Sequence, residues 1–216
     1  MSDKIWIEWI GLWGSGKTTC INNLLKRLKS SGYTTNSTRT FFAQNRYTKF
    51  YKCIKYFPRT VLISLNLLFL LAPIYLRAFF GKDTILTNEF RSFLSCYLAR
   101  LSLVYKTDSD FTLWEGELHL LPILGLDERS IEKVIDILLD INRNRVNAFV
   151  VMKVDVEIAL ARVLKDQKEG KNIRFSQAQQ SSMLNHIAKF NTAQDYLVQS
   201  LRERRSIVYE GNGDIE

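Results

Sequence analysis

The stretch GLWGSGKTTC, residues 11–20, decides the fold of this chain. It fits the pattern G-x-x-x-x-G-K-[ST], in which glycines let consecutive backbone N–H groups approach a phosphate and a helix begins at the lysine. A mostly apolar run, IWIEWI, precedes it, and residues 18–30 follow with an apolar stripe at helical spacing. This order of strand, loop and helix predicts a site for a nucleoside triphosphate. The loop candidates are Gly11, Gly14, Ser15, Gly16, Lys17, Thr18 and Thr19.

Three of the candidate residues have expected chemical roles. We expect Lys17 to bridge the β- and γ-phosphates and the Thr18 hydroxyl to hold Mg²⁺. The third, Glu115, ends the predicted strand FTLWE, residues 111–115. Carboxyl ends of parallel strands meet at one edge of a sheet, so Glu115 is predicted beside the loop, where it would organise Mg²⁺ or accept a proton from an attacking hydroxyl. A glycine follows it, and Glu117 is the alternative carboxylate.

The rest of the chain alternates between strand and helix patterns. Predicted strands cover residues 5–10, 33–42, 111–115, 148–154 and 206–210, and predicted helices cover residues 18–30, 127–145, 156–164 and 176–204. This alternation predicts an α/β fold, a five-stranded parallel sheet with helices on both faces. The 216 residues form one domain in this interpretation, with the core in residues 1–45 and 107–216.

Residues 46–106 are predicted to form a helical insertion between the second and third strands. Residues 9–82 contain twelve Lys and Arg residues and no acidic residue, although the whole chain has a net charge of +8. This distribution predicts an acidic partner for the segment. Residues 60–76 carry no charge and are just long enough for a transmembrane helix. Such a helix would put the loop and the last three strands on opposite sides of a bilayer, so we do not expect this segment to cross a membrane. Two options stay open: a buried core helix, or a helix on the surface of an anionic membrane.

The cysteines and histidines form no metal or disulfide pattern. The three cysteines are far apart and there are only two histidines, so we expect neither a zinc site nor a disulfide framework. No signal peptide is recognisable before the loop, which indicates a cytoplasmic location, with residues 46–80 at the inner face of the membrane as an option. The aromatic residues of the basic segment fit helix packing, and we expect no nucleic-acid partner. A homodimer is left open.

The charged turn KDQKEGKNIR, residues 165–174, is a candidate lid. A basic loop that closes over a triphosphate would neutralise developing charge and exclude water. We therefore expect Lys168 and Lys171 to contact the nucleotide and Arg174 to act in catalysis, within a lid over residues 165–175.

The runs GLWGSGKTT and VVMKVDVEIALARVLKD together resemble the thymidylate kinase-like branch of the nucleoside and nucleoside-monophosphate kinases. In that family a strand ending in a Val-Asp-Val-type sequence precedes a helix whose arginine lies by the adenine, and a lid follows. The resemblance implies that ATP is the donor, that Arg162 lies by the adenine, and that residues 211–214 border the base. It also implies that the acceptor binds between the second and third strands. It covers the chain in order, and the phosphate loop is its one specific motif.

The chain departs from that family after its third predicted strand. The family has Asp-Arg or Glu-Arg-Ser there, and this chain has Glu115, Gly116 and Glu117. A competing placement puts the acidic–arginine pair at Glu89 and Arg91 (TNEFRS). The glutamate that the family carries just before the first glycine of the loop is also missing. These departures favour an acceptor other than thymidylate.

The sequence therefore predicts a kinase that uses ATP and Mg²⁺ and passes the γ-phosphoryl group to a small acceptor. The resemblance implies a nucleoside or nucleotide acceptor, and the basic insertion suggests a sugar or lipid-linked glycan at the membrane surface as an alternative. A membrane-recruited ATPase or switch is a further alternative, although it would normally carry a third-strand aspartate and a water-orienting glutamine. The candidate acceptor-binding residues are Arg39, Arg77, Glu89 and Arg91.

Overall fold

The computed structural model describes most of the predicted core. It covers residues 4–12, 14–38, 84–106, 108–121, 124–169, 180–204 and 206–212, and helical positions 65, 67, 69–74, 76, 77 and 80. Most of the predicted lid, with Lys171 and Arg174, lies outside the described residues, as do Arg39 and the basic stretch 46–59.

Five parallel strands form a single sheet in the order β2-β3-β1-β4-β5. The strands are β1 (Ile5–Gly11), β2 (Thr35–Ser37), β3 (Phe111–Trp114), β4 (Val146–Lys153) and β5 (Ile207–Asn212). The central strand β1 pairs with β3 on one side and with β4 on the other. The predicted α/β fold with a five-stranded parallel sheet is confirmed.

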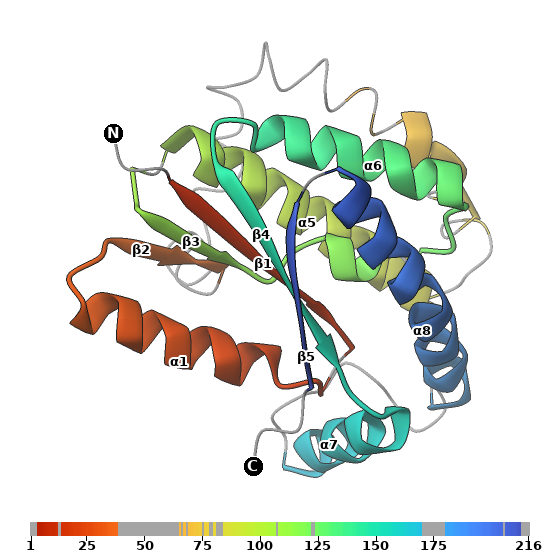
Figure 1. Ribbon diagram of the computed structural model, residues 1–216. Helices are drawn as coiled ribbons and strands as arrows, with labels where there is room; N and C mark the ends of the chain where they lie inside the picture. Colours follow the sequence, from red (N-terminus) through yellow and green to blue (C-terminus); the bar gives the residue numbers. More distant parts are fainter. Residues whose placement is uncertain are drawn as a thin grey trace.

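Alternate side chains of β1 point into two different layers. Trp9 packs with Ile21 of the first helix, whereas Trp6 and Ile10 belong to clusters formed with helices on the opposite face. The helices are α1 (Lys17–Ser30), α5 (Thr84–Lys106), α6 (Glu128–Ile141), α7 (Val156–Lys168) and α8 (Gln180–Glu203). In Figure 1, α1 covers one face of the sheet, α5, α6 and α8 cover the other, and α7 lies beyond the carboxyl ends of the strands. Burial on both faces explains why the central strands β1, β3 and β4 are mostly apolar.

Helix α6 shows how the sequence specifies a helix of the outer layer. The Asp127 carboxylate caps it by accepting a hydrogen bond of 2.7 Å from the backbone N–H of Ser130. Buried side chains then recur from Ile131 at i+3, i+4 and i+7. Burying each contributes about 1.5–3 kcal/mol, so packing of this face outweighs helix propensity. The helix ends at Ile141, before the predicted residue 145, because the chain turns there to enter β4.

Two other predicted boundaries are wrong. Helix α7 continues to Lys168, whereas a lid turn was predicted from residue 165; a backbone hydrogen bond of 3.0 Å from Glu169 to the Lys165 carbonyl keeps this last turn helical. Strand β2 spans Thr35–Ser37, so the described part of the strand predicted over residues 33–42 is shorter than expected, and residues 39–42 lie outside the described residues. Among the described residues β2 pairs with the short strand β3, which limits how far this ladder extends.

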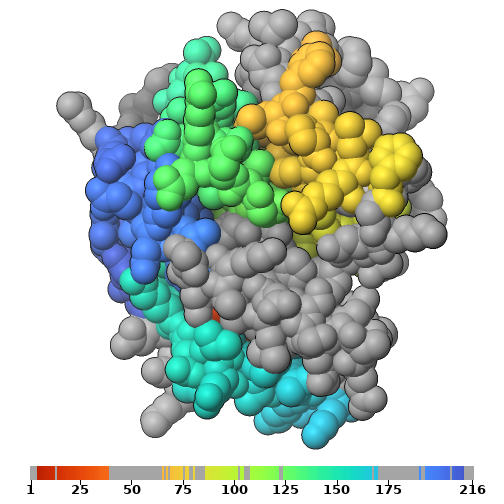
Figure 2. Space-filling model, turned by 90° about the vertical axis from the view of Figure 1, so that its right-hand side faces the viewer, coloured from red at the N-terminus to blue at the C-terminus, as the bar shows by residue number. Residues whose placement is uncertain are grey.

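The described part of the uncharged segment 60–76 is helical, and it has apolar side chains on two faces. One set, Leu67 and Leu71, is buried in the main hydrophobic core. The other set is exposed and comprises Leu65, Phe69 and Leu76, with Phe69 exposed by 76%, and Phe80, just after the segment, is exposed as well. Figure 2 shows this segment in orange and yellow at the surface. The buried set fits the first of the two predicted options, a core helix, and the second option, a helix on a membrane surface, stays a prediction. Among the described residues no helix has the length and hydropathy needed to cross a membrane.

Candidate active site

The phosphate loop joins β1 to α1 and takes its shape from glycines. Gly14 and Gly16 have φ angles of 76° and 86°, in the left-handed region that disfavours side chains. A Cβ atom at Gly14 would also lie 2.6 Å from the carbonyl oxygen of Ala159. Helix α7 therefore approaches the loop more closely than a residue other than glycine at position 14 would allow. At Gly14, therefore, conformation and packing both require a glycine, and at Gly16 the conformation does.

Lys17 is the first residue of α1, and its side chain is buried inside the loop. Its Nζ donates hydrogen bonds of 2.7 Å to the carbonyl oxygens of both Gly11 and Leu12, and lies 3.5 Å from the Ser15 hydroxyl. A buried ammonium group needs such partners, because leaving water without them is costly. The loop thus holds its one positive side chain where the phosphates of a nucleotide are expected.

Glu115 follows β3 and faces the loop, as predicted from its place at the end of a parallel strand. Its Oε2 accepts a hydrogen bond of 3.3 Å from the Thr18 hydroxyl, and its Oε1 lies 3.9 Å from the Lys17 Nζ. The backbone N–H of Glu115 donates to the Thr38 hydroxyl at 2.7 Å, which connects the turn to the end of β2. Glu115 keeps 30% of its side chain exposed, so a ligand can reach it. The Thr18 hydroxyl and this carboxylate are hard oxygen donors, the kind that Mg²⁺ prefers.

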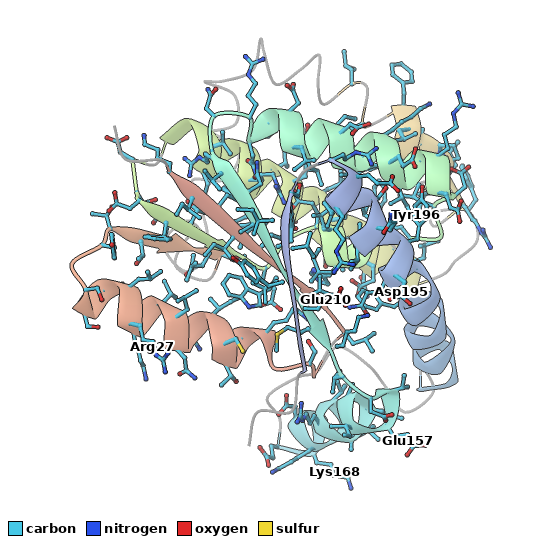
Figure 3. The ribbon with its side chains drawn as sticks, viewed as in Figure 1. Arg27, Glu157, Lys168, Asp195, Tyr196 and Glu210 are labelled. Carbon is cyan, nitrogen blue, oxygen red and sulfur yellow. The ribbon has the colours of Figure 1, made fainter. Side chains whose placement is uncertain are left out.

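Arg162 links α7 to the loop, because its Nη1 donates a hydrogen bond of 3.2 Å to the carbonyl oxygen of Gly14. The amino end of α7 is closed by Asp155, whose carboxylate accepts from the backbone N–H of Glu157 at 2.7 Å. Glu157 and Lys168 extend from opposite ends of α7 at the carboxyl side of the sheet (Figure 3). The structure brings Arg162 to the loop, and its contact with an adenine remains a prediction.

Of the candidate acceptor residues, Arg39 lies outside the described residues, and the other three differ in burial. Arg77 and Arg91 are exposed, whereas Glu89 is 4% exposed within α5. Since α5 runs unbroken from residue 84 to 106, Glu89 and Arg91 lie within a helix and cannot be the pair that follows a strand. This corrects the competing placement and leaves Glu115 as the acidic residue after the third strand.

Next to the site lies a buried ionic cluster that was not predicted from the sequence. It consists of three charged side chains, with a tryptophan as a further hydrogen-bond donor. Arg100 of α5 binds the carboxylates of Glu8 and Glu117 through Nη2 and Nε, and all three side chains are 0–1% exposed. Glu117 also accepts a hydrogen bond of 2.9 Å from Trp114 Nε1. Burial raises the pKa of the Glu8 carboxyl to about 7, against the opposing charge of Arg100. A glutamate inside an apolar strand was the only sequence signal for this cluster.

The cluster also decides between the two candidate carboxylates. Glu117 lies inside the core among Arg100 and Trp114, so a substrate cannot contact it without unfolding the turn. Gly116 lies directly under the Trp114 indole, and a Cβ atom there would overlap the ring. With Trp114 in this position, a residue with a side chain does not fit between Glu115 and Glu117.

Comparisons with known proteins give similarity in structure. No protein-family model matches the chain, and no curated protein matches it significantly in sequence. The chain is similar to two solved structures of deoxyadenosine kinase from M. mycoides. The one with bound dCTP has a TM-score of 0.41 at 11% identity and covers 98% of this chain and 92% of the kinase. The one with bound dATP has a TM-score of 0.44 at 12% identity and covers 98% and 93%.

Proposed function

We propose that this chain is an ATP-dependent phosphotransferase that passes the γ-phosphoryl group to a small acceptor. One observation carries the proposal: the Lys17 ammonium, the Thr18 hydroxyl and the Glu115 carboxylate converge at the carboxyl edge of β1 and β3. Backbone N–H groups of the loop would bind the phosphates, and Lys17 would neutralise the charge between the β- and γ-phosphates. Thr18 and Glu115 would hold Mg²⁺, which supplies further neutralisation of the phosphates when it is bound.

Transfer to a second substrate is favoured by the position and exposure of Glu115. Its carboxylate is partly exposed and lies next to Thr18 and Lys17, within reach of a hydroxyl that approaches from solvent. Such a hydroxyl would give its proton to Glu115 as it attacks the γ-phosphorus, and ADP would leave. Arg162, held on the Gly14 carbonyl, would contribute to the nucleotide side of the site.

We propose a nucleoside or nucleotide as the acceptor class, following the resemblance of the phosphate loop and the α7 region to nucleoside kinases. A sugar or lipid-linked glycan at a membrane surface is the second candidate. It is favoured by the exposed apolar side chains within residues 65–80, which follow closely on residues 46–59, a stretch whose charged residues are all Lys or Arg. Arg77 is exposed in the same segment and is the described residue best placed to meet an anionic surface.

A panel of acceptors tests the proposal. The full chain is incubated with ATP and Mg²⁺ together with nucleosides, nucleotides, sugars or glycan lipids in vesicles, and labelled product is separated from inorganic phosphate. We expect acceptor-dependent product formation that Lys17→Met abolishes, since methionine keeps the buried stem and removes the charge. Release of phosphate at one rate with every acceptor would contradict phosphotransfer and favour a nucleotide-hydrolysing switch.

A further inference from the structure

The buried ionic cluster contains two carboxylates and one guanidinium, and it is fully hydrogen-bonded. Arg100 donates to one oxygen of each carboxylate. The remaining oxygen of Glu117 accepts from Trp114 Nε1 at 2.9 Å, and that of Glu8 accepts from the backbone N–H of Leu118 at 3.3 Å. The guanidinium also stacks over the Trp6 ring, with its central carbon 4.9 Å from the ring centroid. Every carboxylate oxygen of the cluster therefore has a donor.

Stability alone does not account for this arrangement. Removing charges from water is costly, and well-packed apolar residues in place of a buried ion pair are often neutral or stabilising. Arg100 is 1% exposed and bound on both sides, so its guanidinium cannot contact a nucleotide or an acceptor. What the cluster provides is a directional connection between three elements: β1 through Glu8, α5 through Arg100, and the turn after β3 through Glu117.

The two outer hydrogen bonds of the cluster fall on either side of Glu115. Trp114, the last residue of β3, bonds to Glu117, and the Leu118 N–H bonds to Glu8, which lies opposite Trp114 in the β1–β3 register. The turn between these two points carries Glu115, whose own N–H is fixed on Thr38. With its neighbours directed into the core, the Glu115 side chain is the one directed to the loop.

We propose that Arg100 is a positioning residue for phosphoryl transfer, holding residues 114–118 through Glu8 and Glu117 so that the Glu115 carboxylate faces Thr18 and Lys17. The proposal rests on the proposed function, because it assigns Glu115 the binding of Mg²⁺ with ATP. Removing Arg100 leaves the carboxylates of Glu8 and Glu117 buried next to each other. They then repel each other, and the turn after β3 is no longer tied to β1 and α5. In the described part of the chain, Arg100 contacts Glu8, Glu117 and Trp6 and not the loop of residues 11–18, so phosphate binding by the loop backbone should persist.

The experiment measures ATP binding as a function of Mg²⁺ concentration, by calorimetry on the full chain without any acceptor. Arg100→Met should raise the Mg²⁺ concentration for half-maximal binding by about tenfold or more, because partners behind a metal ligand typically contribute about 10–100-fold. Glu115→Gln should have a similar effect. The double variant Arg100→Met/Glu115→Gln should be no worse than Glu115→Gln alone, since Arg100 acts through Glu115.

Arg145→Met is the matched control. Arg145 is a half-buried arginine whose guanidinium also lies over the Trp6 ring, 5.7 Å from its centroid. Its Nη1 donates a hydrogen bond of 2.9 Å to Thr112 of β3, two residues before Trp114. Its loss should lower the melting temperature and leave the Mg²⁺ dependence within about twofold of the unmodified chain. Arg100→Lys should be intermediate, because an ammonium cannot bind both carboxylates in the geometry of a guanidinium.

Three outcomes would overturn the positioning role: a Mg²⁺ dependence of Arg100→Met equal to that of Arg145→Met, multiplying effects in the double variant, or no effect of Glu115→Gln. If Arg100→Met does not fold, Glu8→Gln/Arg100→Met/Glu117→Gln replaces it, since this triple variant leaves no buried charge and still lacks the connection. Failure of the proposed function is seen separately: ATP and Mg²⁺ would bind, but no acceptor in the panel would be phosphorylated.

Discussion

The contact between α7 and the phosphate loop leads to a prediction with two separable parts. Gly14 has a φ of 76°, and a Cβ atom there would lie 2.6 Å from the Ala159 carbonyl oxygen. Gly32 has a similar φ of 85°, but nothing lies within 4 Å of the position of its Cβ. Gly32→Ala therefore reports the cost of backbone conformation alone, and Gly14→Ala reports the same cost together with the steric conflict.

The expected magnitudes follow from this difference. A left-handed conformation costs a non-glycine residue about 1–2 kcal/mol, and the stiffer unfolded chain offsets about 0.4–1 kcal/mol, which leaves about 1 kcal/mol for Gly32→Ala. At Gly14 the Cβ would be 0.8 Å inside the 3.4 Å at which ordinary contact begins, since 3.4 − 2.6 = 0.8. Forcing backbone apart in a packed region adds about 1–3 kcal/mol. The free energy of unfolding should therefore fall by about 2–4 kcal/mol in Gly14→Ala.

Urea denaturation and thermal melting of the two variants test this reasoning. For a chain of 216 residues, each kcal/mol corresponds to a shift of about 2–4 °C, so the melting temperature should fall by about 3 °C in Gly32→Ala and about 10 °C in Gly14→Ala. Gly14→Ala should also weaken ATP binding, because Arg162 of α7 donates its hydrogen bond to the Gly14 carbonyl oxygen, and moving α7 away would disturb this contact. Equal destabilisation of the two variants would show that α7 does not press on the loop.

Three further predictions concern Glu115 and the buried cluster. Glu115→Gln should lower kcat for phosphoryl transfer by about 10²–10⁴-fold if the carboxylate accepts the hydroxyl proton, and unchanged single-turnover rates would remove Glu115 from the chemistry. Burial raises the pKa of Glu8 from 4.5 to about 7, so the folded protein binds a proton that the unfolded chain has lost between these values. This stabilisation is present below about pH 4.5 and is lost as the pH rises through 7. The free energy of unfolding, measured with urea, should therefore fall from about pH 5 to 8 in the unmodified chain and fall less in Glu8→Gln. The same slope in both proteins would contradict the raised pKa of Glu8. Gly116→Ala should destabilise by about 3 kcal/mol through its overlap with the Trp114 indole. The double variant with Trp114→Leu should be less destabilised than the sum of the two single variants, and a tolerated alanine in the single variant would contradict the close approach.

The phosphate loop and the sheet could be predicted from local sequence because both depend on local rules. Glycines, a lysine and flanking apolar periodicity specify the strand, loop and helix with no knowledge of the rest of the chain. Glu115 could be placed because the end of a parallel strand fixes which edge of the sheet it occupies. These expectations need only the order of elements, which the sequence shows directly.

The buried cluster could not be predicted, because its members come from distant parts of the chain. Arg100 meets Glu8 across 92 positions and Glu117 across 17, and neither spacing is a motif. The choice between Glu115 and Glu117 depends on the Trp114 indole that fills the space under Gly116. The end of α7 at Lys168 was missed because a charged turn and an exposed last helical turn have the same composition.

The packing of Trp114 over Gly116 constrains how this chain can change over evolutionary time. An arginine at position 116, as in the Glu-Arg pattern of the thymidylate kinase-like proteins, would overlap the indole. A smaller residue at position 114 would have to come first, and it would remove the Trp114 donor from Glu117 and leave a buried carboxylate oxygen without it. Each single substitution is therefore expected to be disfavoured without the other, so positions 114 and 116 should change together.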